Sequence, residues 1–66
     1  MKKYRVMYRE SDRESDLRSL TEEVYADGWR VDQESVVLFT HKADRDEPVF
    51  DVPKSRVERI QEIGAG

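Results

Sequence analysis

Residues 14–28 read ESDLRSLTEEVYADG, and this stretch decides which fold class the sequence predicts. Its apolar side chains recur at positions i, i+3, i+7 and i+8, the spacing of one face of an α-helix; they are Leu17, Leu20, Val24 and Tyr25. Gly28 then supplies a residue at which a helix ends without a Cβ penalty. The sequence therefore predicts an amphipathic helix over residues 14–27.

The segment before this helix alternates between two kinds of side chain. One face carries Tyr4, Val6 and Tyr8, and the other carries Lys3, Arg5, Met7 and Arg9. A period of two with aromatic and β-branched residues is typical of a half-buried strand. We expect a strand over residues 3–9 whose tyrosine face is covered by the helix.

The middle of the chain predicts a hairpin. The run Val36-Val37-Leu38-Phe39 is apolar on both faces of a strand, so this strand should be buried on both faces. After a charged loop, residues 49–52 form a third strand between two prolines, and residues 36–42 pair antiparallel with residues 48–52. Trp29 and Val31 could begin a further strand, but polar residues 32–35 interrupt the pattern.

The C-terminal segment allows two interpretations. Ser55 and Glu58 match a capping box, and Val57, Ile60 and Ile63 recur every three residues before Gly64. This pattern favours a short helix over a last strand. The predicted fold class is therefore α+β: a small β-α-β-β sheet with one long helix packed on one face and a short C-terminal helix or last strand. Residues 1–66 form a single domain with a flexible tail at 64–66.

Length and composition limit what holds such a domain together. A chain of 66 residues buries only roughly 60% of its unfolded surface. It has no cysteine, so disulfides and thiolate metal sites are excluded. The longest apolar run, at residues 36–39, is far too short to span a bilayer, and no apolar segment follows Met1-Lys2-Lys3 as it would in a signal peptide. We expect a cytoplasmic protein.

No residue pattern in the chain indicates catalysis. His41 is the only histidine, and the nearby Asp44, Asp46 and Glu47 could at most form a weak cation site with it. The alternative is a histidine at a strand end beside a solvated charged loop, because the glycine and distal glutamate of a calcium loop are missing. We expect no enzymatic activity, no cofactor and no metal.

The first candidate surface is the outward face of the first strand. Lys3, Arg5 and Arg9 lie on it, so it could contact phosphates or an acidic patch on another protein. The alternative is an ordinary solvated sheet face whose cations pair with carboxylates of neighbouring strands.

The second candidate surface is apolar. Trp29, Val37 and Phe39, together with Phe50, Ile60 and Ile63, exceed what one helix on one sheet face can cover. Either the C-terminal segment or a partner must cover the rest. Trp29 is the best single candidate for an interface residue, and its alternative role is to close the core.

These patterns favour a small non-enzymatic protein-interaction module, an adaptor, regulator or inhibitor of a larger protein, that self-associates, most simply as a homodimer. The alternative is a nucleic-acid-binding module that uses the basic face of the first strand. Neither interpretation requires a membrane or a small-molecule substrate.

Overall fold

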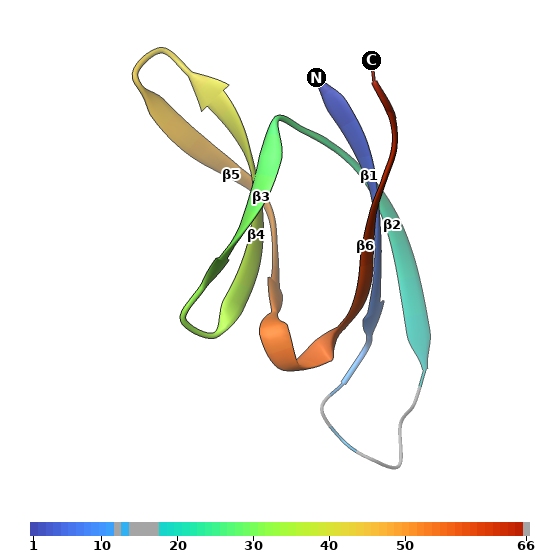
Figure 1. Cartoon of the computed structure of the whole chain (residues 1–66). Helices are drawn as coiled ribbons and strands as arrows, with labels where there is room; N and C mark the ends of the chain where they lie inside the picture. Colours follow the sequence, from blue (N-terminus) through green and yellow to red (C-terminus); the bar gives the residue numbers. More distant parts are fainter. Residues whose placement is uncertain (12, 14–17, 66) are drawn as a thin grey trace.

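The computed structural model describes residues 1–11, 13 and 18–65 of the chain. These residues form six β-strands and one short 3-10 helix (Figure 1). The elements are β1 (Lys2–Arg9), β2 (Ser19–Ala26), β3 (Gly28–Asp32), β4 (Ser35–Lys42), β5 (Arg45–Pro53), η1 (Lys54–Arg56) and β6 (Val57–Ala65).

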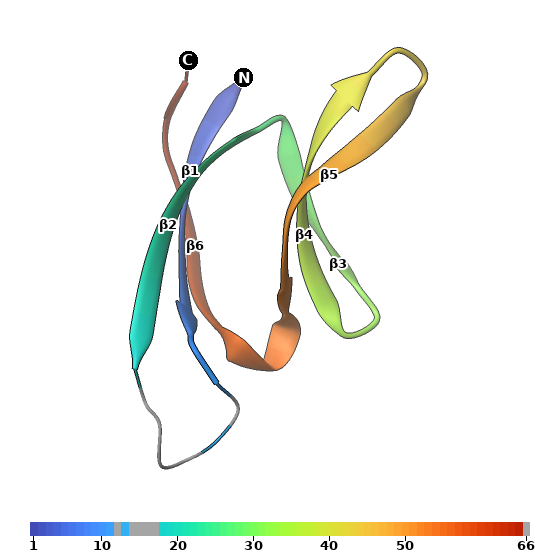
Figure 2. The ribbon, with the colours of Figure 1, turned by 180° about the vertical axis from the view of Figure 1, so that it is seen from behind.

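The strands form two antiparallel sheets of three strands each. Sheet A has the order β2-β1-β6, and sheet B has the order β3-β4-β5. The two views in Figures 1 and 2 show the sheets side by side, joined by the bend from β2 into β3 and by η1. Such bends allow consecutive strands to leave one sheet and enter the other.

The predicted α+β fold class is wrong, because the described residues contain no α-helix and are almost entirely strand. The predicted helix over 14–27 falls partly on residues 14–17, which lie outside the described residues, and Ser19–Ala26 of the remainder form strand β2. Leu20 and Val24 are four residues apart, so they share a face in a strand as well as in a helix. The pairing of β2 with β1 decides between the two, and Val24 then lies directly opposite Tyr4.

The predicted C-terminal helix is also wrong, since residues 57–65 form strand β6. Val57 lies opposite Tyr8 and Ile60 opposite Val6, so a separation of three positions along β6 matches a separation of two along β1. A bulge absorbs the extra residue and returns Ile60 to the buried face. A bulged strand therefore produced the period of three that resembles a helix. Gly64 and Ala65, expected in the tail, pair with Lys3 and Lys2, and Gly66 lies outside the described residues.

Two sequence predictions are confirmed. Residues 3–9 form most of β1, and the hairpin joins β4 to β5 with Val36 opposite Val52. The charged loop is shorter than expected, because the strands continue to Lys42 and Arg45 and leave a two-residue turn. Ala43 in this turn has a φ of 53°, in the left-handed region.

The core lies between the two sheets. Its buried members are Tyr4, Val6, Ala26, Val36, Leu38 and Val52. At its margin the rings of Tyr8 in β1 and Phe50 in β5 meet edge to face, with centroids 5.8 Å apart. Sheet B, rather than a helix, therefore covers the tyrosine face of β1. No helix among the described residues has the length and apolar character needed to cross a membrane.

Candidate functional site

The six residues predicted to bind a partner lie on three separate surfaces. Lys3, Arg5 and Arg9 lie on the outer face of sheet A, as the alternation of β1 requires. Val37 and Phe39 lie on the outer face of sheet B, whereas Trp29 is opposite Leu38 and so belongs to its inner face. The structure thus does not gather the predicted residues into one site.

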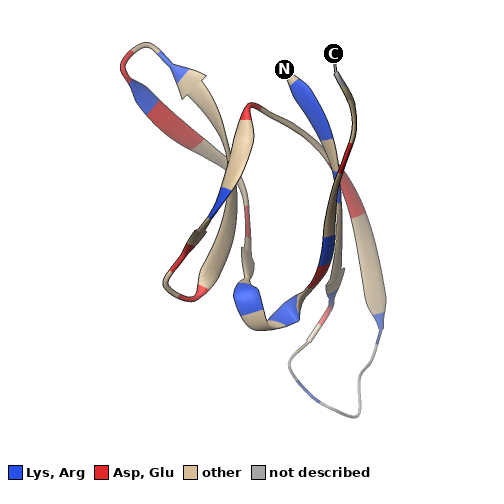
Figure 3. Ribbon diagram, in the orientation of Figure 1, with Lys and Arg blue, Asp and Glu red and all other residues tan. Residues whose placement is uncertain are grey.

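A single carboxylate of β2, that of Glu23, pairs with two cations of the basic face on sheet A. Lys3 Nζ lies 3.0 Å from Glu23 Oε1, and Arg5 Nη2 lies 3.5 Å from Glu23 Oε2. Figure 3 shows basic segments of β1 beside an acidic segment of β2. The hydrogen bond from Lys3 and its charge lower the pKa of Glu23, and the same hydrogen bond and the carboxylate charge raise the pKa of Lys3.

At the Arg9 end of β1, the basic face continues onto the neighbouring strand β6. Arg9 Nη2 donates a hydrogen bond of 2.6 Å to the carbonyl oxygen of Ser55 in η1. Arg59 in β6 lies directly opposite the outward-facing Met7. Arg59 is exposed and makes no ion pair within the described residues. Sequence reasoning missed Arg59, because only the pairing of β6 with β1 brings it onto this face.

The outer face of sheet B is covered by its own side chains. Val37 is only 5% exposed, with Arg30 and Asp51 as its cross-strand neighbours. The guanidinium carbon of Arg30 lies 5.4 Å from the centroid of the Phe39 ring, an arrangement that favours a cation–π contact. A Cβ at Gly28 would lie 3.1 Å from the end of the Phe39 ring, so glycine lets this ring lie flat on the sheet.

His41 sits at the end of this face. Its Nδ1 lies 2.5 Å from Asp46 Oδ1, and its backbone N–H donates to Asp27 Oδ2 at 2.6 Å. Arg30 Nη1 lies 3.7 Å from the other oxygen of Asp46. The described residues contain no group of three or more potential ligands suited to a metal. His41 and Asp46 lie directly opposite each other and form a cross-strand polar pair between β4 and β5.

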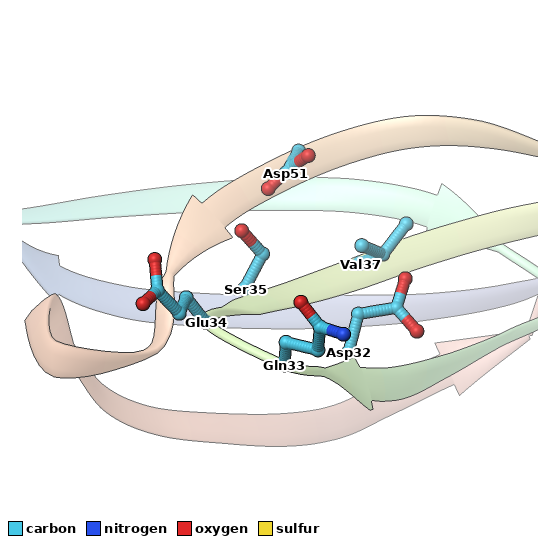
Figure 4. Close-up of a pocket in the computed structure, with 6 residues that line it drawn as sticks. All are labelled: Asp32, Gln33, Glu34, Ser35, Val37 and Asp51. Atoms are coloured by element: carbon cyan, nitrogen blue, oxygen red, sulfur yellow. The ribbon is translucent and has the colours of Figure 1, made fainter.

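An open hollow lies near the turn between β3 and β4. Figure 4 shows the residues around it: Asp32, Gln33, Glu34, Ser35, Val37 and Asp51. Three of these residues carry carboxylates, which make the hollow acidic, and only one lining residue, Val37, has an apolar side chain. Such a lining is poorly suited to an organic ligand, which needs mostly apolar walls.

The edge strand β3 exposes a row of apolar side chains. Trp29 is 45% exposed and Val31 is 51% exposed, although their neighbours across the ladder, Leu38 and Val36, are buried. Contacts between the sheets join β2 to β4 and β5, so sheet A covers the centre of sheet B. The β3 edge, defined here as Gly28–Asp32 with its free backbone side, extends beyond that cover.

The other edge strands carry features that discourage pairing. β5 contains Pro48 and Pro53 and a register shift, and β6 has two register shifts. β2 is regular but places the adjacent carboxylates Glu22 and Glu23 at its middle. The β3 edge is short and bears Arg30 and Asp32, but it has no proline and no register shift.

Comparisons with protein-family models, with curated proteins and with solved structures return no match.

Proposed function

We propose that this protein is a small non-enzymatic protein-interaction module that binds its partner along the β3 edge. The observation that carries the proposal is the pair Trp29 and Val31, two large apolar side chains about half exposed on one face of a regular edge strand. An edge strand offers unpaired backbone groups to an extended segment, and alternate side chains provide the specificity.

The energetics of the two side chains support this site. Tryptophan is among the residue types that contribute most to binding at interfaces. Burying apolar surface contributes about 25 cal/mol per Å², so covering both side chains favours association. The apolar strand β4, which the sequence suggested as the interface, contributes less, because Val37 is already buried within the chain.

The test uses three immobilised baits and a lysate of the native cells. The baits are the wild type, Val31→Lys, and Val49→Lys as a matched control. Val49 is also a valine on an edge strand and is 45% exposed, but it lies on β5. We expect at least one protein to be retained by the wild type and by Val49→Lys and lost with Val31→Lys. Identical sets of captured proteins from all three baits, together with a wild type that does not self-associate through β3, would refute binding along β3.

A second candidate function is binding of nucleic acid on the outer face of sheet A. Arg59 is the observation that favours it, because it adds a fourth cation to Lys3, Arg5 and Arg9 on that face. Glu23 weighs against it, since its carboxylate already pairs with Lys3 and Arg5. We therefore rank this candidate second.

Salt dependence separates this candidate from the first. If phosphates bind to this face, affinity for single-stranded or duplex DNA or RNA should fall steeply as salt rises. The double variant Arg5→Glu with Arg9→Glu should abolish binding, whereas the charge-matched variant Lys42→Glu with Arg45→Glu, on the β4–β5 hairpin, should retain it. Absence of any binding at low salt removes the candidate.

A further inference from the structure

We infer that the partner of the β3 edge is a second copy of this chain, paired antiparallel through β3 about a two-fold axis at Arg30. The inference rests on the proposed function and names the occupant of its surface. In this arrangement the two copies of sheet B join into one sheet of six strands. A two-fold axis perpendicular to the sheet keeps inward residues opposite inward residues, and centring it at Arg30 uses the whole length of Gly28–Asp32.

The apolar face of β3 is complementary to itself in this register. Trp29 of one copy lies opposite Val31 of the other, and the two-fold axis produces this pair twice. Aromatic side chains opposite β-branched ones are among the stabilising cross-strand pairs. Both exposed apolar side chains of the edge are then covered, Trp29 from 45% and Val31 from 51% exposure.

The charged face is complementary as well. The two copies of Arg30 lie opposite each other, and each has Asp32 of the second copy as its diagonal neighbour, within reach of a long side chain. Within one chain Arg30 already lies 3.5 Å from Asp32 and 3.7 Å from Asp46. Two arginines and four carboxylates therefore lie near the junction, and the carboxylates offset the repulsion between the two guanidinium groups.

The length of the strand sets the strength of the association. Stable interfaces bury about 1,200–2,000 Å² in total, and a junction of two five-residue strands offers less than that. We therefore expect a weak dimer whose population rises with concentration in the high-micromolar range (a Kd on the order of 0.1 mM). Association of two copies through the β3 edge is reversible and forms no covalent bond.

Sedimentation equilibrium from about 10 μM to about 1 mM tests the inference at concentrations on both sides of that Kd. We expect a monomer–dimer equilibrium for the wild type. Val31→Lys removes both Trp29–Val31 pairs and should raise the Kd roughly tenfold, whereas Val49→Lys should leave it unchanged. A wild type that stays monomeric across the whole range overturns the inference, as does an equal effect of the two variants.

Because the chain contains no cysteine, single cysteine variants report the register directly. Residues opposite each other in an antiparallel pair have Cα atoms about 4.5–5.5 Å apart, within the range of a disulfide. With oxidised glutathione as oxidant, Arg30→Cys should form a disulfide dimer much faster than Val31→Cys or Val49→Cys. Faster cross-linking of Val31→Cys would show a different register and overturn this one.

The outcome also separates the inference from the proposed function. A monomeric wild type combined with loss of a captured protein in Val31→Lys means that a different protein occupies the β3 edge. A dimer that forms normally in Val31→Lys means that the chain associates elsewhere and that the inference is wrong.

Discussion

At the scale of single residues, the molecule relies on a few side chains that link neighbouring strands. Glu23 reaches two cations of β1, and Asp27 accepts the backbone N–H of His41 while its own N–H donates to the carbonyl oxygen of Phe39 at 2.8 Å. These contacts join segments that are distant in sequence. Their charges are visible in the sequence, but their partners depend on strand register.

The contacts of Glu23 predict how stability depends on pH. Its pKa is lowered from 4.5, so the stabilisation is complete above that value and is lost as the pH falls through the lower pKa of the folded protein. The pKa of Lys3 is raised from 10.5, so its stabilisation is complete below that value and is lost as the pH rises through the higher pKa. Neutral solutions retain both.

Urea unfolding of wild type and Glu23→Gln at acidic, neutral and alkaline pH measures this effect. We expect the two proteins to differ most near neutrality and to converge at both extremes. Glu22→Gln is the control, because Glu22 is adjacent on β2 and makes no ion pair among the described residues. A constant difference between wild type and Glu23→Gln at every pH would contradict the assignment.

At the scale of elements, a strand was predicted correctly where its residue pattern fits only a strand, and wrongly where the pattern also fits a helix. β1 alternates strictly and carries no apolar residue on its outer face except Met7, so only a strand fits it. The pattern of β2 suits a helix and a strand equally at Leu20 and Val24, and the bulge in β6 gives Val57 and Ile60 the spacing of a helix. Pairing with β1 decides both cases, and no window of a single sequence contains that information.

The candidate site could be predicted only in part, for the same reason. The exposed cations of β1 follow from alternation alone, whereas the position of Trp29 depends on β3 being an edge strand. Sequence reasoning left open whether Trp29 closes the core or faces solvent, and a strand order was needed to decide. Arg59 lies on the basic face only because β6 pairs with β1, and no pattern in the sequence around Arg59 predicts that position.

The turn between β4 and β5 gives a prediction for an element. Ala43 has a φ of 53°, which costs an L-residue with a Cβ roughly 1–2 kcal/mol and costs glycine nothing. Ala43→Gly should therefore stabilise the protein by about 0.5–1 kcal/mol, since part of the gain is offset by the greater flexibility of the unfolded chain. Thermal unfolding measures the change.

Ala26→Gly is the control for this substitution, because Ala26 is fully buried in β2 and its φ is not positive. It should destabilise the protein. Destabilisation by both substitutions would show that the turn does not hold Ala43 in the left-handed region.

At the scale of the whole molecule, a very small interior supports two sheets. Leu38 and Val6 are the only large side chains with essentially no exposure among the described residues. A domain of 66 residues has a stability of about 3–10 kcal/mol, so one interior side chain is a large part of the total.

Leu38→Ala should cost about 2–5 kcal/mol and leave the protein partly or wholly unfolded. Val31→Ala, at a half-exposed position on the neighbouring strand, should change stability by less than about 0.5 kcal/mol as a monomer. Circular dichroism and urea unfolding at low micromolar concentration distinguish the two. If Leu38→Ala unfolded cooperatively at the same urea concentration as the wild type, the core between the two sheets would not be centred on Leu38.

The pairing of β1 with β6 has a consequence for synthesis on the ribosome. β1 is the middle strand of sheet A, and one of its two neighbours comes from residues 57–65. During translation the first hairpin emerges early, but its second side stays open until those residues leave the exit tunnel. Sheet A therefore cannot be completed before residues 57–65 have been synthesised, in one step that follows the folding of sheet B.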